Sequence, residues 1–159
     1  MPETRAPGGA PAGEEPVRVV IGFDFGLRRI GAARGDTLTR RATPLPPLDR
    51  TRAGPDWQRI DRYLADWQPA LLVVGLPYNA DGSEGALAPE VRAFARSLSE
   101  RFARPVEFID ERYSSLDAQA RLARQRAAGT RRRRVGKADV DAEAACVILE
   151  RWFDAFATR

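Results

Sequence analysis

The chain has 159 residues, of which 43% are hydrophobic and 30% charged, with a formal net charge of +4, and this is enough for one domain with a buried core. It contains no histidine and a single cysteine, Cys146, which excludes Ser/His and Cys/His nucleophilic catalysis, histidine metal sites, intramolecular disulfides and cysteine-rich zinc sites. Any chemistry must therefore come from carboxylates, hydroxyls, Lys and Arg side chains or a bound hard cation.

Residues 1–16 are rich in Pro, Gly, Ala and Glu, so we expect a disordered N-terminal tail followed by a single domain over residues 17–159. The tail lacks the basic region and apolar core of a secretory signal. No apolar stretch reaches the roughly 20 residues that a membrane-spanning helix needs. We therefore expect a cytoplasmic protein.

The first expected elements are three strands. Residues 18–25 (RVVIGFDF) are apolar at nearly every position, which is typical of a central strand covered on both faces. Gly26 ends this strand, and residues 29–34 predict the returning strand. A weaker third strand is expected over residues 37–43, closed by the prolines that follow. Together these strands would form an antiparallel meander.

Helices and strands alternate in the rest of the chain. Apolar spacing predicts helices from Trp57 to Trp67 and from Leu87 to Phe102, strands over residues 71–75 and 106–109, a helix over residues 116–125 after a cap at Ser115, and a last helix from about Asp141. The order βββαβαβαα predicts an α/β domain with a five-stranded mixed sheet, its first three strands antiparallel, flanked by helices. This order matches the ribonuclease H-like architecture.

Three acidic residues, Asp24, Glu111 and Asp141, lie at the ends of expected elements beside apolar sequence. Carboxylates that converge from separate elements repel one another unless a cation or proton lies between them. Mg²⁺ prefers oxygen ligands of this kind, and two such ions about 4 Å apart would suit phosphodiester cleavage. The three are therefore candidate metal ligands and catalytic residues, with Asp110 and Asp139 as reserve ligands.

Each carboxylate also has an ordinary structural interpretation. Asp24 could form an ion pair with one of the two arginines after Leu27. Glu111 could pair with Arg112 at the surface, and Asp141 could cap its helix. The combination of the three acids, the missing histidines and a nearby arginine block favours the metal site.

Basic and aromatic residues indicate an anionic polymer as the partner. The candidate phosphate contacts are Arg28, Arg29, Arg112, Arg131, Arg132, Arg133, Arg134 and Lys137. The turn at residues 75–79 could hold a phosphate on its backbone amides, and Tyr78 could stack on a base. An ordinary turn capped by Ser83 or Asp81 explains the same pattern.

Four stretches, in order along the chain, resemble the YqgF/RuvX family of ribonuclease H-like proteins: GFDFGLRRIGAA, VVGLPYNADGSEG, DERYSS and VGKADVDAEAACVILERWF. The resemblance covers roughly residues 17–156, and four motifs in one order are far more specific than one. It implies a nuclease that uses Mg²⁺ or Mn²⁺, with Asp24, Glu111 and Asp141 at the family's acidic positions.

The resemblance leaves the substrate open. It implies processing of the 5′ end of the precursor of 16S rRNA in ribosome biogenesis. The family also resembles RuvC-type resolvases, which implies cleavage of a four-way DNA junction as the alternative. Ribonuclease H-like enzymes generally carry an acid at the end of the fourth strand, where this chain has residues 75–77 (GLP). A non-catalytic RNA-binding assembly factor is therefore a third interpretation. We expect a monomer or a weak homodimer.

Overall fold

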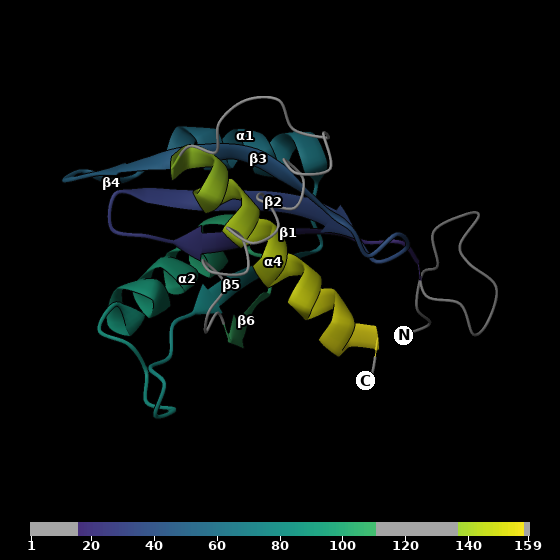
Figure 1. Ribbon diagram of the computed structural model, residues 1–159. Helices are drawn as coiled ribbons and strands as arrows, with labels where there is room; N and C mark the ends of the chain where they lie inside the picture. Colours follow the sequence, from purple (N-terminus) through teal and green to yellow (C-terminus); the bar gives the residue numbers. More distant parts are fainter. Residues whose placement is uncertain (1–15, 111–136, 158–159) are drawn as a thin grey trace, which may run out of the picture.

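The computed structural model describes residues 16–110 and 137–157, without the side chains of residues 137–139, 141 and 157. In this part of the chain, helices lie on both faces of a mixed sheet (Figure 1). The strands are β1 (Val19–Phe25), β2 (Arg29–Asp36), β3 (Ala42–Thr51), β4 (Gly54–Pro55), β5 (Leu71–Leu76) and β6 (Val106–Asp110), and the helices are α1 (Trp57–Trp67), α2 (Ala88–Phe102) and α4 (Lys137–Ala157). The expected tail and the helix predicted over residues 116–125 lie outside the described residues.

The sheet has the strand order β4-β3-β2-β1-β5-β6. Strands β1, β2 and β3 form the predicted antiparallel meander, whereas β5 and β6 run parallel to β1. The mixed sheet is therefore confirmed, but it has six strands rather than five. The additional strand is the two-residue β4, which pairs with the end of β3.

The third strand lies later in the chain than predicted, over Ala42–Thr51 instead of residues 37–43. The Asp36 carboxylate accepts hydrogen bonds from the backbone N–H groups of Leu38 and Thr39, at 3.0 and 2.8 Å, and so closes a turn where the strand was expected. Strand β3 can contain prolines because, on its outer side, it pairs only with the two-residue β4. Few strand hydrogen bonds are therefore lost where a proline lacks its N–H group.

The last helix also differs from its prediction. Helix α4 begins at Lys137, one turn before the expected start near Asp141. None of the helices in the described ranges is long and apolar enough to cross a membrane.

Alternating side chains of β1 separate two apolar clusters. Ile21, Phe23 and Phe25 belong to the cluster that α1 and α2 complete, and Val20 belongs to the cluster that α4 completes. Gly22 also faces α4, since a Cβ built on it would lie 3.2 Å from the Leu149 Cβ. This alternation is the two-residue period of a strand buried on both faces.

Helix α4 can cross the sheet closely at Gly22 only because this residue has no side chain. We predict that Gly22→Val lowers the free energy of unfolding by about 1–3 kcal/mol, because the added atoms overlap Leu149 in a packed core. Urea denaturation measures the change. Thr43→Val, at an exposed position of β3, is the control and should change stability by less than about 0.5 kcal/mol. Equal effects at both positions would contradict close packing at Gly22.

Tyr63 connects α1 to the proline-containing strand. Its side chain is buried, and its hydroxyl donates a hydrogen bond to the backbone carbonyl of Pro46. Burial raises the pKa of the Tyr63 phenol above its ordinary value of 10.0. Above pH 10 the unfolded chain therefore releases this proton first, and the free energy of unfolding falls as pH rises.

Tyr63→Phe separates the two contributions of this residue. At pH 7 the variant should be less stable than the wild type by about 1 kcal/mol, because the hydrogen bond to Pro46 is lost. Above pH 10 the gap should narrow, because only the wild type loses the stability that the neutral phenol provides. Urea denaturation from pH 7 to 11 tests this, and a gap that stays constant with pH would contradict it.

Candidate active site

Asp24 is the only one of the three predicted acidic ligands whose side chain lies in the described part of the chain. It is the second-last residue of β1 and is half-buried. On β2, the residue paired with Asp24 is Gly31. On β5, Val74 pairs with Phe23, and the next residue is Gly75. Neither of these two glycines has a side chain that could crowd the carboxylate.

The direction of Asp24 follows from its apolar neighbours. The Phe23 ring meets the Phe94 ring of α2 edge-on, with 5.6 Å between the ring centroids, and the Phe25 and Phe94 centroids are 5.0 Å apart. These contacts hold both phenylalanines on the α2 face. Alternation then directs Asp24 to the face that α4 covers.

The direction in which helix α4 runs over β1 follows from two glycine contacts. The helix lies over Gly22 with Ala145 and Leu149, and over Gly35, farther from Asp24, with Phe153. Its N-terminal half therefore extends toward the end of β1 where Asp24 lies. Asp141 precedes Ala145 by one turn, about 6 Å, which matches the roughly 6.6 Å from Gly22 to Asp24.

Asp110, a reserve ligand, lies on the other face of the sheet. It pairs in register with Leu76, whose side chain belongs to the cluster on the α1 and α2 face. Its backbone carbonyl accepts a hydrogen bond from Arg151 Nη1 at 3.0 Å. Asp110 and Asp24 therefore point to opposite faces, and the structure does not bring these two carboxylates together.

The other acidic candidates, and the basic candidates that follow Arg29 in the sequence, have no described side chains. Glu111, Arg112 and Arg131–Arg134 lie outside the described residues, and Lys137, Asp139 and Asp141 belong to α4 through their backbone only. Within residues 16–110 and the described side chains of α4, no three acidic or cysteine side chains form a cluster that could hold a metal. The three-carboxylate site stays a prediction.

In the part of the chain that the structure describes, Asp24 does not form the ion pair with Arg28 or Arg29 that the structural interpretation requires. Arg28 is exposed in the turn between β1 and β2, and Arg29 is the first residue of β2. Among the ion pairs of the described residues, none joins Asp24 to Arg28 or Arg29. A half-buried carboxylate that is not paired with either neighbouring arginine suits Mg²⁺ or Mn²⁺, which prefer oxygen ligands.

Tyr78 lies between core and surface. Its ring packs against the cluster on the α1 and α2 face, and its backbone forms a bridge with Glu84. The Asp81 carboxylate accepts hydrogen bonds from the Ser83 N–H at 2.9 Å and from the Ser83 hydroxyl at 2.6 Å. The loop is therefore closed by its own side chains, as the ordinary-turn interpretation predicts, and base stacking by Tyr78 stays a prediction.

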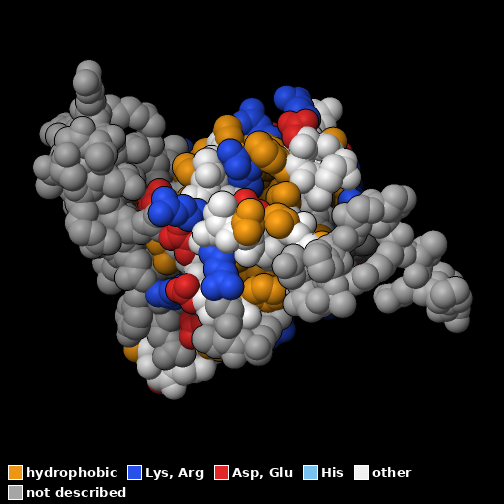
Figure 2. Space-filling view, turned by 90° about the vertical axis from the view of Figure 1, so that its right-hand side faces the viewer, with side chains coloured by type: hydrophobic (Ala, Val, Ile, Leu, Met, Phe, Trp, Pro, Cys, Tyr) orange, Lys and Arg blue, Asp and Glu red, His pale blue; other side chains and the backbone are white. Residues whose placement is uncertain are grey.

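The end of the sheet away from Asp24 has a mixed surface. Figure 2 shows Arg side chains there beside acidic and hydrophobic ones. Val17 and Leu38, at 57% and 72% exposed, flank the hydrogen bonds between Arg18 and Thr37 at this end. No patch of a single charge sign forms among the described residues of this view.

Sequence reasoning missed Arg50, which contacts the turn after Asp24. The Arg50 Nη1 atom donates hydrogen bonds to the carbonyls of Gly26 and Leu27, at 3.1 and 3.2 Å. Arg50 follows the prolines that were expected to end the third strand, so no pattern in the sequence placed it beside a turn more than 20 residues earlier.

Comparison with known proteins identifies close relatives in sequence. The model of the RuvX family, described as Holliday junction resolvase, matches residues 18–155. A protein from Edwardsiella ictaluri named "Putative pre-16S rRNA nuclease" is 45% identical over 137 residues, which cover 86% of this chain and 95% of the relative. A protein of the same name from Xanthomonas campestris pv. campestris is 47% identical over 140 residues, covering 88% and 90%.

Solved structures share the fold at low sequence identity. T. thermophilus RuvC in complex with a Holliday junction substrate has a TM-score of 0.52 and 18% identity, covering 89% of this chain and 96% of that chain. The yeast mitochondrial Holliday junction resolvase Ydc2 has a TM-score of 0.51 and 10% identity, covering 87% and 78%. These likenesses confirm the ribonuclease H-like α/β fold.

Gly26 is required by the close turn after Asp24. Its N–H donates to the Arg29 carbonyl at 3.0 Å, and a Cβ built on it would lie 2.6 Å from the same oxygen. We predict that Gly26→Ala forces the turn to shift and lowers the free energy of unfolding by about 1–3 kcal/mol, as measured by urea denaturation.

The control for this variant lies in the same turn. The Leu27 side chain is 75% exposed, so Leu27→Ala should change stability by less than about 0.5 kcal/mol. A Gly26→Ala variant as stable as the wild type would show that the turn adapts freely, and would contradict its tight coupling to the end of β1.

Proposed function

Because this chain belongs to the RuvX family, we propose that it is a nuclease that hydrolyses phosphodiester bonds at the 5′ end of the 16S rRNA precursor. We infer this substrate from the name of two relatives, "Putative pre-16S rRNA nuclease", which align with this chain over 95% and 90% of their length. The observation that carries the proposal is Asp24, a half-buried carboxylate at the end of the central strand with glycine neighbours and, within residues 16–110, no ion pair to an arginine. Such a substrate would place the protein in the cytoplasm. We further propose that it acts as a monomer or a weak homodimer.

The proposed site combines Asp24 with Glu111 and Asp141 as oxygen ligands for Mg²⁺ or Mn²⁺. A divalent ion bound there supplies charge stabilisation in the transition state and a water of lowered pKa. Asp24 contributes a fixed direction, because its phenylalanine neighbours hold β1 against α2. Asp141 would approach from α4, and Glu111 would act as a ligand or orient the attacking water.

Arginines at the same end of the sheet would bind the substrate. Arg28 is exposed in the turn, three residues after the end of β1, and the block Arg131–Arg134 would add further phosphate contacts. Phosphate contacts give affinity and strong salt dependence without reading base sequence. A substrate selected by shape, such as structured precursor RNA, suits this arrangement.

A four-way DNA junction is the second candidate substrate. The matching family model is described as Holliday junction resolvase, and the RuvC structure with the same fold contains a junction. Symmetric cleavage of a junction needs a two-fold dimer that presents two sites. Sedimentation of the protein with and without a junction would show whether such a dimer forms.

Asp24→Asn tests the proposed function. We predict that the variant loses at least about 100-fold of the Mg²⁺- or Mn²⁺-dependent cleavage of a 5′-extended 16S precursor RNA, because the amide is a poor metal ligand. Its affinity for the RNA should stay within about twofold, because the arginines are unchanged. Cleavage on denaturing gels and filter binding measure the two quantities.

Asp66→Asn, on the exposed face of α1, is the matched control and should cleave like the wild type. Full activity of Asp24→Asn would remove Asp24 from the site. A wild-type protein that binds the precursor but never cleaves it would favour the assembly factor. Cleavage of a four-way junction but not of RNA would favour the resolvase.

A further inference from the structure

The turn between β1 and β2 lacks the residues that usually stabilise so short a connection. Gly26 and Arg29 pair through a backbone hydrogen bond of 3.0 Å, which leaves Leu27 and Arg28 as a two-residue loop. Two-residue hairpins prefer turns with positive φ at Gly, Asn or Asp. Neither Leu27 nor Arg28 has a positive φ, and both side chains are exposed. The loop therefore needs support from outside.

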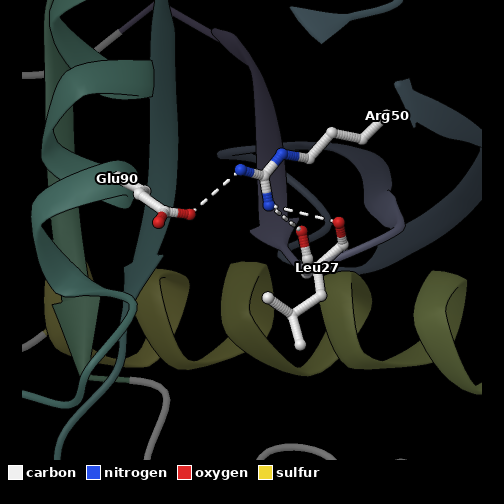
Figure 3. A network of polar contacts seen from close by, with 4 residues as sticks. Leu27, Arg50 and Glu90 are labelled. Carbon is white, nitrogen blue, oxygen red and sulfur yellow. Dashed lines mark hydrogen bonds and ion pairs between the residues drawn. The ribbon is translucent and has the colours of Figure 1, made fainter. Parts of the chain in front are cut away.

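Arg50 of β3 supplies this support. Its Nη1 atom donates to the carbonyls of Gly26 and Leu27, at 3.1 and 3.2 Å, and its backbone N–H donates to the Arg28 carbonyl at 2.9 Å. Figure 3 shows the guanidinium directed at the carbonyls of the turn. One residue thus binds three successive carbonyls of the connection that begins two residues after Asp24.

Two further contacts fix the Arg50 side chain itself. Its Nη2 atom lies 2.9 Å from a carboxylate oxygen of Glu90, in the first turn of α2 (Figure 3). The guanidinium also lies over the Phe25 ring, 4.4 Å from its centroid. The Arg50 side chain is 22% exposed and the Glu90 side chain 53%, so solvent weakens the ion pair, and the carbonyl bonds and the ring contact hold the guanidinium as well. The turn is thereby joined to β3, to α2 and to the last residue of β1.

We propose that Arg50 is a positioning residue for the nuclease site: it holds the turn after β1 and thereby fixes the Asp24 carboxylate and the Arg28 side chain. The inference rests on the proposed function. Arg50 acts through the backbone and does not bind the substrate, since its guanidinium is occupied by two carbonyls and a carboxylate. Lysine could not replace it fully, because one ammonium cannot reproduce the planar fork.

Arg50→Met tests the proposal because it keeps the apolar stem and removes the guanidinium. We predict that amide hydrogen exchange of residues 25–30 becomes at least about tenfold faster, because the turn loses its support. The kcat for precursor RNA should fall at least about tenfold, with KM within about threefold, because a misplaced carboxylate slows the chemical step more than binding. Arg50→Lys should lie between the wild type and Arg50→Met.

Arg101→Met is the matched control. Arg101 also forms an ion pair, with Asp61 at 3.6 Å, and lies over an aromatic ring, that of Trp57 at 5.0 Å. It lies on α2 and makes no contact with the turn, so exchange of residues 25–30 and kcat should stay within about twofold of the wild type. Circular dichroism verifies that all variants are folded.

Unchanged exchange of residues 25–30 in Arg50→Met, or wild-type kcat, would overturn the proposal. Should Arg50→Met not fold, Arg50→Lys takes its place, because it also removes the fork that binds two carbonyls, and the same two outcomes decide. Should the wild type cleave no RNA, the proposed function fails, whereas the exchange rates alone still decide whether Arg50 holds the turn.

Discussion

Helix α4 crosses the sheet at Gly22, and the arrangement of the candidate site depends on this contact. A Cβ at this position would lie 3.2 Å from the Leu149 Cβ and 3.6 Å from the Ala145 carbonyl oxygen, so a branched side chain here would force Leu149 or the helix to shift. The close crossing sets the height of the helix above β1 and its level along the strand. It therefore sets how near the N-terminal half of α4, with Asp141, comes to Asp24.

The second constraint is the two-sided burial of β1. Phe23 and Phe25 pack on Phe94 of α2, so the strand cannot rotate without losing aromatic contacts in the core. Because the residues on both sides of Asp24 are anchored, the direction of its Cα–Cβ bond is fixed. The turn that follows is held in the same way, by Arg50, so the rigid part of the fold continues past the end of the strand. Preorganisation of this kind is what a metal-dependent site requires.

Much of the fold could be predicted because β1 and β5 are apolar at nearly every position and the helices have apolar residues at helical spacing. The third strand could not, because the Asp36 side chain closes a turn where a strand was expected and pairing with β2 overrides the prolines. Asp24 could be identified as an unusual charge in an apolar strand. The face of Asp110 depends on the register of β6 with β5, and Arg50 acts on backbone carbonyls, which no residue pattern marks.

The central claim is that Asp24 and the N-terminal half of α4 form one divalent-metal site. Substoichiometric Mn²⁺ added to the ¹⁵N-labelled protein tests it most directly, because a paramagnetic ion broadens the amide signals nearest to it. We predict that the signals of residues 23–25 and 139–142 broaden first, and that Asp24→Asn abolishes this selective broadening. Broadening that begins in the loop around Asp81 or at the turn of Asp36, with residues 23–25 unaffected, would contradict it.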